Sequence, residues 1–484
     1  MPKLDAIGKF LRVNGQDLGG FAIWGEHVII GANQWFSPLR KRGEMKKSLR
    51  WLCVLAACWA ALGCGISTPT PAPATSQPLE PATLPPPTSA PAVDVPAAPP
   101  AGDTPTAPAV PTPITRPVGV TLLELHMTDA ATGWAVGQIP GFSLEFVLRT
   151  ADGGATWRDV TPAPVKSLSV QTDLATAAFF MDANRAWAVF GSQAPEPLAT
   201  DEVVVWRTTD GGQNWEASQP LNMDGLQSEF FMPGEVVFTQ ELSGWVMVHL
   251  GAGMSHDYVA IYATRDGGVT WERMIDPQRG NLPMSCSKSG IQFLQWESGW
   301  VTGNCPGLMP GVYFYATQDG GKSWSGVDLP VPTNDPTLLK DQTMCGLPHE
   351  PVFINGKSGY QVVQCLYVDA NQAAQYLYVT QDSGVSWSPR NLPAAYGEVF
   401  FLDELNGWFV GGAEREFTNG TKMYRTEDGG QNWWPLSILI WSGPIQFVNP
   451  QVGWVIAKID QASTLVKTTN GGQSWMDLKP VVIP

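Results

Sequence analysis

The residues of this chain that could carry chemistry are its few histidines, its loop carboxylates and its cysteines. His249 and His256 are close enough in sequence to be two ligands of one metal ion, but no third ligand accompanies them. The chain has no Glu-flanked His pair of the metalloprotease kind, no Gly-x-Ser-x-Gly turn and no phosphate-binding loop. The sequence therefore predicts no metal site and no cofactor.

Acidic residues in the long connections offer a second kind of chemistry. Two carboxylates that face each other across a cleft can hydrolyse a glycosidic bond. The candidates are Glu196, Asp201, Asp257, Asp335, Asp341 and Glu414. Their spacing selects no pair, so a surface glycan-binding protein or a glycoside hydrolase is kept as the alternative function.

An octamer that ends in tryptophan occurs seven times and organises the rest of the chain. The first copy, Thr150 to Trp157, lies between two extended stretches, so it is predicted to be the turn of a hairpin. The paired glycines permit positive φ, and the acidic residue before them can accept hydrogen bonds from the turn. Seven equivalent copies indicate a structural role. The third positions are Asp152, Asp210, Asp266, Asp319, Asp382, Asp428 and Asn470, and the closing residues are Trp157, Trp215, Trp271, Trp324, Trp387, Trp433 and Trp475.

A second motif precedes each octamer and completes the repeat. Its copies are Gly133-Trp134, Ala186-Trp187, Gly244-Trp245, Gly299-Trp300, Gly359-Tyr360, Gly407-Trp408 and Gly453-Trp454. One repeat then contains strand A, a turn, the Gly-Trp strand B, a loop, strand C, the octamer and strand D. Each repeat is a four-stranded antiparallel blade, and radial packing of seven blades buries faces that one blade could not bury alone. The sequence therefore predicts an all-β, seven-bladed β-propeller over residues 119–484.

The octamer resembles the Asp-box, or BNR repeat. The paired rhythm of Gly-Trp and Asp-box resembles most the photosystem II assembly and stability factor family of lumenal propellers, over roughly residues 119–484. This resemblance implies a non-catalytic, chaperone-like protein whose partner is a membrane-protein assembly intermediate. Sialidases, sortilin-type receptors and xyloglucanases share the box, so the motif by itself indicates the fold and not the function.

The enzymes that share the box make specific demands which the chain does not meet. The sialidase family carries a Phe-Arg-Ile-Pro motif in its first blade, whereas this region has only Arg149 and Arg158 beside an octamer. Xyloglucanases use two propellers, and this chain has one. We therefore expect no enzyme, with the glycosidase as the second hypothesis.

Four cysteines lie inside the predicted propeller, and the strand order pairs them. Cys305 and Cys365 each end a strand B, and Cys286 and Cys345 each precede strand A of the same two blades. In an antiparallel A–B pair the start of A lies beside the end of B. Among three possible connectivities, the sequence predicts the disulfides Cys286–Cys305 and Cys345–Cys365.

The sequence predicts an export signal near the N-terminus. Residues 45–64 combine a basic start with a short uncharged run that is too short to span a bilayer comfortably. The run ends in Ala-Leu-Gly-Cys64, which resembles a bacterial lipobox and implies lipidation of Cys64. The local pattern around Cys58 also fits, and an ordinary signal peptide is the remaining alternative. We expect Met45 to be the true start and residues 1–44 to be an over-extended N-terminus.

Residues 65–118 are dominated by Pro, Ala, Thr and Ser and cannot bury enough apolar surface to fold. We interpret them as a disordered, semi-rigid linker that holds the propeller away from a membrane. The sequence therefore predicts an extracytoplasmic protein that is anchored to a membrane by an N-terminal lipid.

The charge of the chain and the composition of its loops limit the kinds of partner that we expect. The chain has 29 Lys and Arg and 44 Asp and Glu, so its net charge is −15. Nucleic acid and anionic lipid head groups bind basic patches, so we expect neither as a partner. The B–C and D–A loops share one face, where binding usually occurs. There we single out Phe142, Tyr258, Arg415 and Phe417 as candidates to touch another extracytoplasmic protein. We expect a monomer.

Overall fold

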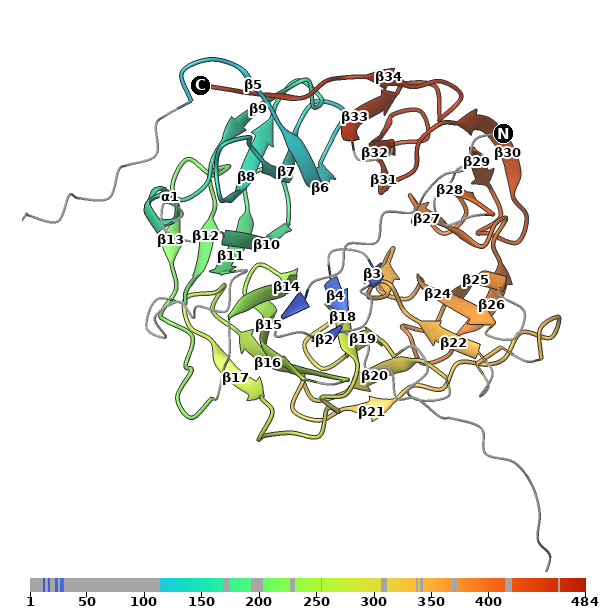
Figure 1. The fold of residues 1–484 in the computed structure, drawn as a ribbon, viewed down its shortest axis with the longest axis horizontal. Helices are drawn as coiled ribbons and strands as arrows, with labels where there is room; N and C mark the ends of the chain where they lie inside the picture. The colour runs from blue at the N-terminus through green and yellow to red at the C-terminus, as the bar shows by residue number, and fades with distance from the viewer. Residues whose placement is uncertain are drawn as a thin grey trace, which may run out of the picture. The chain divides into compact units, whose positions relative to one another are not determined.

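The structure is a computed structural model, and the residues that it describes cover most of the predicted propeller (Figure 1). Cys64, Arg415 and Phe417 lie outside the described residues, as do the predicted signal and almost all of the linker. The described residues are 12–13, 16–17, 22–24, 27–29, 114–168, 174–192, 203–226, 231–253, 255–305, 311–336, 338–339, 343–367, 372–413, 420–459 and 462–484.

The chain divides into two compact units, Met1–Pro99 and Pro100–Pro484. In the first unit, β1 (Arg12–Val13) pairs with β2 (Gln16–Asp17), and β3 (Ala22–Trp24) pairs with β4 (His27–Ile29). In the part of the chain that the structure describes, no helix is long and apolar enough to cross a membrane.

Strand pairings in the described part of the second unit form four separate four-stranded sheets, one six-stranded sheet and one nine-stranded sheet. We group their strands by sequence repeat into antiparallel sets of four, called sheets 1 to 7; sheet 1 is part of the six-stranded sheet, and sheets 4 and 5 share the nine-stranded sheet with one further strand. Sheets 1 to 4 contain β6 (Thr121–Met127), β7 (Gly133–Gln138), β8 (Glu145–Thr150), β9 (Thr156–Asp159); β10 (Leu174–Phe180), β11 (Ala186–Ser192), β12 (Val205–Thr208), β13 (Glu216–Ala217); β14 (Met232–Gln240), β15 (Ser243–Gly253), β16 (His256–Thr264), β17 (Glu272–Ile275); and β18 (Ser287–Phe293), β19 (Gly299–Asn304), β20 (Tyr313–Thr317), β21 (Ser325–Gly326). Sheets 5 to 7 contain β23 (Val352–Phe353), β24 (Gly359–Tyr367), β25 (Gln372–Thr380), β26 (Ser388–Asn391); β27 (Tyr396–Phe401), β28 (Gly407–Gly412), β29 (Thr421–Thr426), β30 (Trp434–Leu439); and β31 (Ile445–Phe447), β32 (Gly453–Ile459), β33 (Ala462–Thr468), β34 (Met476–Asp477).

The sheets stand around a common centre, with the first strand of each sheet innermost and the last outermost (Figure 1). This confirms the predicted all-β propeller fold of four-stranded antiparallel sheets. One short helix, α1 (Ala163–Leu168), interrupts the connection from sheet 1 to sheet 2, which the sequence analysis did not predict.

The C-terminus closes the ring onto the first sheet. β35 (Val481–Ile483) pairs in parallel with β9, and β5 (Val118–Gly119) pairs with the other side of β35. Val482 is fully buried. Sheets 7 and 1 are also joined through Gln446, whose side chain exchanges two hydrogen bonds with the backbone of Met127.

The octamers fold as self-contained turns. In the first, Asp152 Oδ1 accepts hydrogen bonds from the backbone N–H groups of Ala155 and Thr156, and its Oδ2 accepts the Thr156 hydroxyl at 2.6 Å. The Thr150 hydroxyl donates to Asp152 Oδ1 and accepts the Gly154 N–H. Gly153 and Gly154 both have positive φ. Both carboxylate oxygens of Asp152 accept hydrogen bonds from within the turn. These contacts agree with the structural role that the sequence predicts for the octamer aspartates.

The Gly-Trp tryptophans tie neighbouring sheets together. Trp187 Nε1 donates to the carbonyl of Gly267 in the octamer of the following sheet at 2.8 Å, and Trp245 Nε1 donates to Gly320 in the same way at 3.0 Å. The Trp245 ring also stacks on Phe293 of the following sheet, with ring centroids 3.8 Å apart. The two sequence motifs therefore meet across each of these seams, which explains why they recur in step.

Both disulfides pair as the sequence predicts. Cys286 joins Cys305 with Cα atoms 4.9 Å apart, and Cys345 joins Cys365 with Cα atoms 4.1 Å apart. Cys345 lies on an additional strand, β22 (Thr343–Gly346), which pairs with β24 ahead of β23. β22 also touches the end of β19, so sheets 4 and 5 are continuous.

Candidate functional site

A recurring position on the innermost strands carries the main cluster of acidic side chains. In every sheet, one apolar residue lies at or near the end of strand A, six positions before the Gly-Trp motif or its equivalent. Three positions earlier in the chain lies a residue of the inner strand or of the segment just before it. In sheets 1 to 7 this residue is Glu124, Ala177, Glu235, Gly290, Glu350, Glu398 and Pro444. We call Glu124, Glu235, Glu350 and Glu398 the inner glutamate ring.

Strand register places these glutamates at one level. Glu124 pairs with Val136 and Glu235 with Met247, in each case directly after a register shift on the inner strand. These shifts add a residue before the glutamate, and they set which side chain reaches the centre. Glu350 lies in the break between β22 and β23, where its carboxylate covers Gly290 of sheet 4. A side chain at Gly290 would collide with that carboxylate.

The glutamates of separate sheets raise one another's pKa. Burial raises the pKa of Glu235 well above its usual value, and the charges of Glu350 and Glu124 raise it further. Burial, then Glu145 and Glu350, raises the pKa of Glu124 to about 7. Burial also raises the pKa of Glu350. Sheets 1, 3 and 5 are not neighbours, so this mutual influence requires side chains directed at a common centre.

The ring has little counter-charge of its own. His349 lies 3.9 Å from Glu398 and is mostly exposed, and in the described part of the chain no Lys or Arg forms an ion pair with Glu124, Glu235 or Glu350. The surface of Glu124 is exposed to solvent even though many protein atoms surround its carboxylate, while the other three glutamates are half-buried. Such carboxylates can accept hydrogen bonds from a cationic group or hold a proton near neutral pH.

A buried polar cluster joins sheets 3 and 4 near the first disulfide. His249 Nδ1 lies 2.8 Å from Asp257 Oδ1, and Asp257 Oδ2 accepts the backbone N–H of Lys288. Lys288 Nζ donates to the carbonyls of Asp257, Ser285 and Cys286. Burial lowers the pKa of Lys288 to about 8, although Asp257 opposes the shift. Because every group is used in these contacts, the cluster fixes the loop before β18.

The two histidines of the sequence analysis lie on paired strands. His249 is on β15 and His256 is on β16, and the two strands pair as far as Gly253 and His256. His256 stacks with Tyr258 at 5.9 Å, away from the contact between His249 and Asp257. Among the described residues, no group of three or more His, Cys, Asp or Glu side chains is placed to hold a metal ion.

The candidate binding residues on the loop face have different surroundings. Phe142 is half-buried and packs edge-on against Phe146 at 5.4 Å. The connection that carries it surrounds a recess of about 340 Å³, together with Thr121 and Leu174. Tyr258 is 37% exposed on the hairpin of β15 and β16. The structure therefore leaves Tyr258 more accessible than Phe142.

The loop carboxylates of the sequence analysis do not converge. Asp257 belongs to the cluster with His249, and Asp335 accepts hydrogen bonds from the hydroxyls of Tyr367 and Tyr376. Glu196, Asp201, Asp341 and Glu414 lie outside the described residues. No pair from the sequence set is brought together in the described part, and the carboxylates that do face each other are those of the inner glutamate ring.

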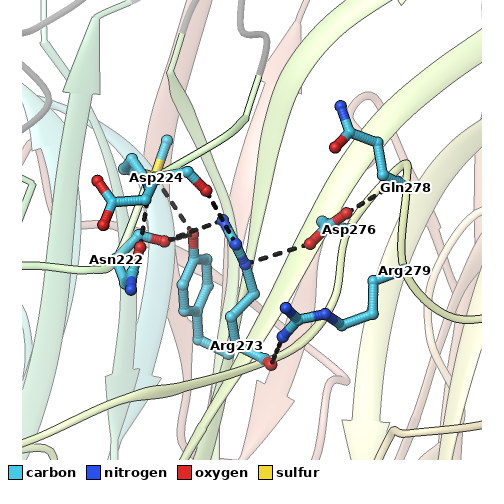
Figure 2. Close-up of polar contacts among 8 residues, drawn as sticks. Asn222, Asp224, Arg273, Asp276, Gln278 and Arg279 are labelled. Carbon is cyan, nitrogen blue, oxygen red and sulfur yellow. Dashed lines mark hydrogen bonds and ion pairs between the residues drawn. The ribbon is translucent and has the colours of Figure 1, made fainter. Parts of the chain in front are cut away.

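Arg273, on the outermost strand of sheet 3, is engaged in structural contacts (Figure 2). Its guanidinium donates to the carbonyls of Asn222 and Asp224, and its Nε lies 3.2 Å from Asp276. The hydroxyl of Tyr262 also donates to the Asn222 carbonyl. Arg273 thus anchors the connection between sheets 2 and 3, and it does not present a free charge to a partner.

The four glutamates of the inner ring share a sequence pattern that the search for catalytic and metal-binding motifs did not identify. The pattern Glu-x-x-Met or Glu-x-x-Phe occurs four times, and each time its last residue lies six positions before the Gly of a Gly-Trp or Gly-Tyr motif. The four copies begin at Glu124, Glu235, Glu350 and Glu398. An alignment of the repeats on the Gly-Trp motif would have shown that the four glutamates occupy equivalent positions. The sequence could not show that this position faces the centre of the ring.

Comparison with known proteins gives distant β-propeller relatives. No protein-family model matches the chain. It is 26% identical over 197 residues to vacuolar protein sorting/targeting protein 10 of Lodderomyces elongisporus, a match that covers 37% of this chain and 12% of the relative. It is 24% identical over 189 residues to the photosystem II assembly lipoprotein Ycf48 of Synechococcus sp. strain CC9902, covering 37% of this chain and 46% of that protein. The chain thus spans less than half the length of these curated relatives.

Solved structures with a similar chain path include both binding proteins and enzymes. A structure of YCF48 bound to D1 peptide has a TM-score of 0.45 and 17% identity, and covers 75% of this chain and 99% of its own. YCF48 from Cyanidioschyzon merolae has a TM-score of 0.41 at 19% identity, over 74% and 97% of the two chains. The α-L-arabinanase of Penicillium chrysogenum has a TM-score of 0.38 at 12% identity, over 63% and 93%.

Proposed function

We propose that this protein is an exported, membrane-tethered propeller that binds another extracytoplasmic protein without catalysing a reaction. The observation that carries the proposal is the inner glutamate ring, in which four sheets contribute a carboxylate at one level. Among the described residues no Lys or Arg forms an ion pair with Glu124, Glu235 or Glu350, and His349 is the basic neighbour of Glu350 and Glu398. A basic segment of a partner protein would supply the missing positive charge and relieve the mutual repulsion.

The partner that we propose is an assembly intermediate of a membrane protein complex. This follows the sequence similarity to an assembly lipoprotein, and it suits a propeller held on a lipid anchor through Cys64 and a linker over residues 65–118. A photosystem II-like complex is the first such partner to test. The partner would approach from the loop face, where His349 is exposed beside Glu398.

The test is a crosslinked pull-down of the tagged protein from its native membranes, with bound proteins identified by mass spectrometry. A triple variant of the ring, Glu124→Gln, Glu235→Gln and Glu350→Gln, should lose the specific partner. The matched control changes the same number of charges on exposed carboxylates away from the ring, with Glu272→Gln, Glu297→Gln and Asp328→Asn. Equal recovery with both variants would reject the ring as the binding site, and no specific partner from the native protein would reject the binding function.

A glycoside hydrolase remains the second candidate because of one observation. The pKa of Glu124 is raised to about 7 beside the carboxylate of Glu145, and an acid of that pKa next to a second carboxylate suits general acid catalysis at neutral pH. Hydrolysis of a panel of polysaccharides that is abolished by Glu124→Gln, and unaffected by Glu272→Gln, would favour the enzyme over the binding protein.

A further inference from the structure

The outer edge of sheet 6 is longer than those of the other sheets. β30 has six residues, whereas the outermost strands of the other six described sheets have four or two. In the described part of the chain, β30 pairs with β29 on one side only. Its free side presents unpaired backbone N–H and C=O groups, which form a template for another strand.

The side chains along this edge are apolar and exposed. Trp434 is 52% exposed, and Ile438 and Ile440 are each 79% exposed. We call these three residues and the free side of β30 the sheet 6 edge patch. Ser437 and Leu439, which flank Ile438, point inward, since Leu439 is buried and Ser437 donates to the carbonyl of Gly472 in sheet 7. The edge is thus held in place from behind while its apolar side chains face outward.

The patch lies in a long uncharged segment. No Asp, Glu, Lys, Arg or His occurs from Gly429 through Ala457, in a chain with a net charge of −15. Edge strands in monomeric proteins are usually protected by charged residues, and here the features that oppose pairing are Pro435 and the register shift between Pro435 and Ser437, both in the first half of the strand. The second half, from Ser437 to Leu439, is regular. Two charged residues lie one strand behind the edge on β29, where Lys422 pairs with Ile438 and Arg425 pairs with Trp434.

The missing charge favours a second copy of the same chain. When two identical strands pair about a two-fold axis, the central residues meet their own copies, so a charge there would face a like charge. An uncharged edge avoids that repulsion between two acidic molecules. A lipid surface is a poorer occupant, because hydrocarbon would leave the backbone groups of the edge unsatisfied. The fold already accepts a strand on an outer edge, since β35 pairs with β9 in sheet 1.

We propose that two copies of this chain associate through β30, edge to edge and antiparallel, about a two-fold axis close to Ile438. The two copies of sheet 6 become one continuous sheet, and Trp434, Ile438 and Ile440 pack against the partner. This departs from the monomer expected from the sequence. It does not depend on the inner glutamate ring, which lies on the opposite, innermost strands.

Sedimentation equilibrium of the full chain over a concentration series tests the proposal. We expect the native protein to be a dimer at micromolar concentration. Ile438→Lys should weaken the dimer by about tenfold or more, because each copy brings its lysine to the other. Val385→Lys is the matched control, since Val385 is 81% exposed on the octamer turn of sheet 5. A native monomer throughout, or equal weakening by both lysines, would overturn the proposal.

A charge-swap experiment identifies the pairing strand directly. Ile438→Lys and Ile438→Glu should each be monomeric alone, and mixing them should restore association, because the two-fold axis then joins opposite charges. Both substitutions are at a mostly exposed position and should preserve the thermal unfolding midpoint. Failure of the mixture to associate would contradict pairing at Ile438.

Discussion

The indole Nε1 of Trp454 donates a 2.9 Å hydrogen bond to the carbonyl oxygen of Gly153. This contact joins the last Gly-Trp motif of the chain to the first octamer. It repeats the contacts that Trp187 and Trp245 make to the octamers that follow them. The ring is therefore closed by the same interaction that holds these internal seams, and β35 strengthens the closure by pairing with β9.

Replacing Trp454 by phenylalanine should lower the free energy of unfolding by about 1–3 kcal/mol, because the buried carbonyl of Gly153 loses its donor. Trp300 provides the control, since it is equally buried but its Nε1 has no partner among the described residues. Trp300→Phe should therefore cost less. Denaturant titration of both variants measures the difference, and equal losses would show that the hydrogen bond contributes nothing beyond the ring.

Removal of residues 481–484 should destabilise the protein by at least about 2 kcal/mol, because it exposes the site of the fully buried Val482 and the free edge of β9. The point variant Val482→Ala should show a smaller loss in the same direction. Thermal unfolding followed by circular dichroism measures both. An unchanged midpoint for the truncated chain would mean that β35 is dispensable for closure.

At the third position of an octamer, asparagine should preserve the free energy of unfolding better than alanine. Asn470 already occupies it in sheet 7, where its Oδ1 accepts the Ser474 N–H and its Nδ2 donates to the Ser474 hydroxyl. Asp152→Asn should therefore be nearly neutral. Asp152→Ala should cost about 1–2 kcal/mol of unfolding free energy, because two turn amides lose their acceptor. Similar losses for both variants, measured by denaturant titration, would contradict this.

The sequence predicted the features that depend on local spacing. Octamer turns such as Thr150 to Trp157 are determined by residues within one hairpin, and the disulfides follow from the ends of two adjacent strands. It could not predict the split of the inner strand into β22 and β23, or the short helix α1, because these depend on packing between sheets.

The inner glutamate ring needed knowledge that local patterns do not contain. Glu124 and Glu235 follow register shifts on β6 and β14, and one added residue changes which face a side chain occupies. The distance between Glu124 and Glu350 depends on the whole ring closing. Conversely, the loop carboxylates that looked suitable for catalysis, such as Asp257, are used in local contacts.

The disulfide Cys345–Cys365 should stabilise the protein by about 3 kcal/mol, because it closes a loop with a sequence separation of 20. The double variant Cys345→Ala and Cys365→Ala should lower the midpoint of thermal unfolding. A reducing agent should lower the midpoint of the native protein in a similar way if it reaches both disulfides. A midpoint that is insensitive to the double substitution would indicate that β22 is held by its pairing with β24 alone.

The pH dependence of stability should reveal the inner glutamate ring. The folded-state pKa of Glu124 is raised from 4.5 to about 7, and that of Glu350 is raised as well. A carboxyl whose pKa is higher in the folded state binds its proton more tightly there, so its stabilising effect is complete below about pH 4.5 and is lost as the pH rises through about 7. The thermal midpoint of the native protein should fall over this window. Glu350→Gln should flatten the decline and raise stability at pH 8.

The octamer aspartates act in the opposite sense and at lower pH. Burial tends to raise the pKa of Asp152, but hydrogen bonds from Thr156, Thr150 and Ala155 outweigh it and hold the pKa below its usual value. Stability from such a group is present above about pH 4 and is lost as the pH falls through the lower folded value. The two effects together place the stability maximum near pH 5. For Glu124→Gln, solvent contact limits the gain at pH 8 to about 1 kcal/mol. A midpoint that rose steadily from pH 5 to pH 8 would show that the glutamates do not face one another.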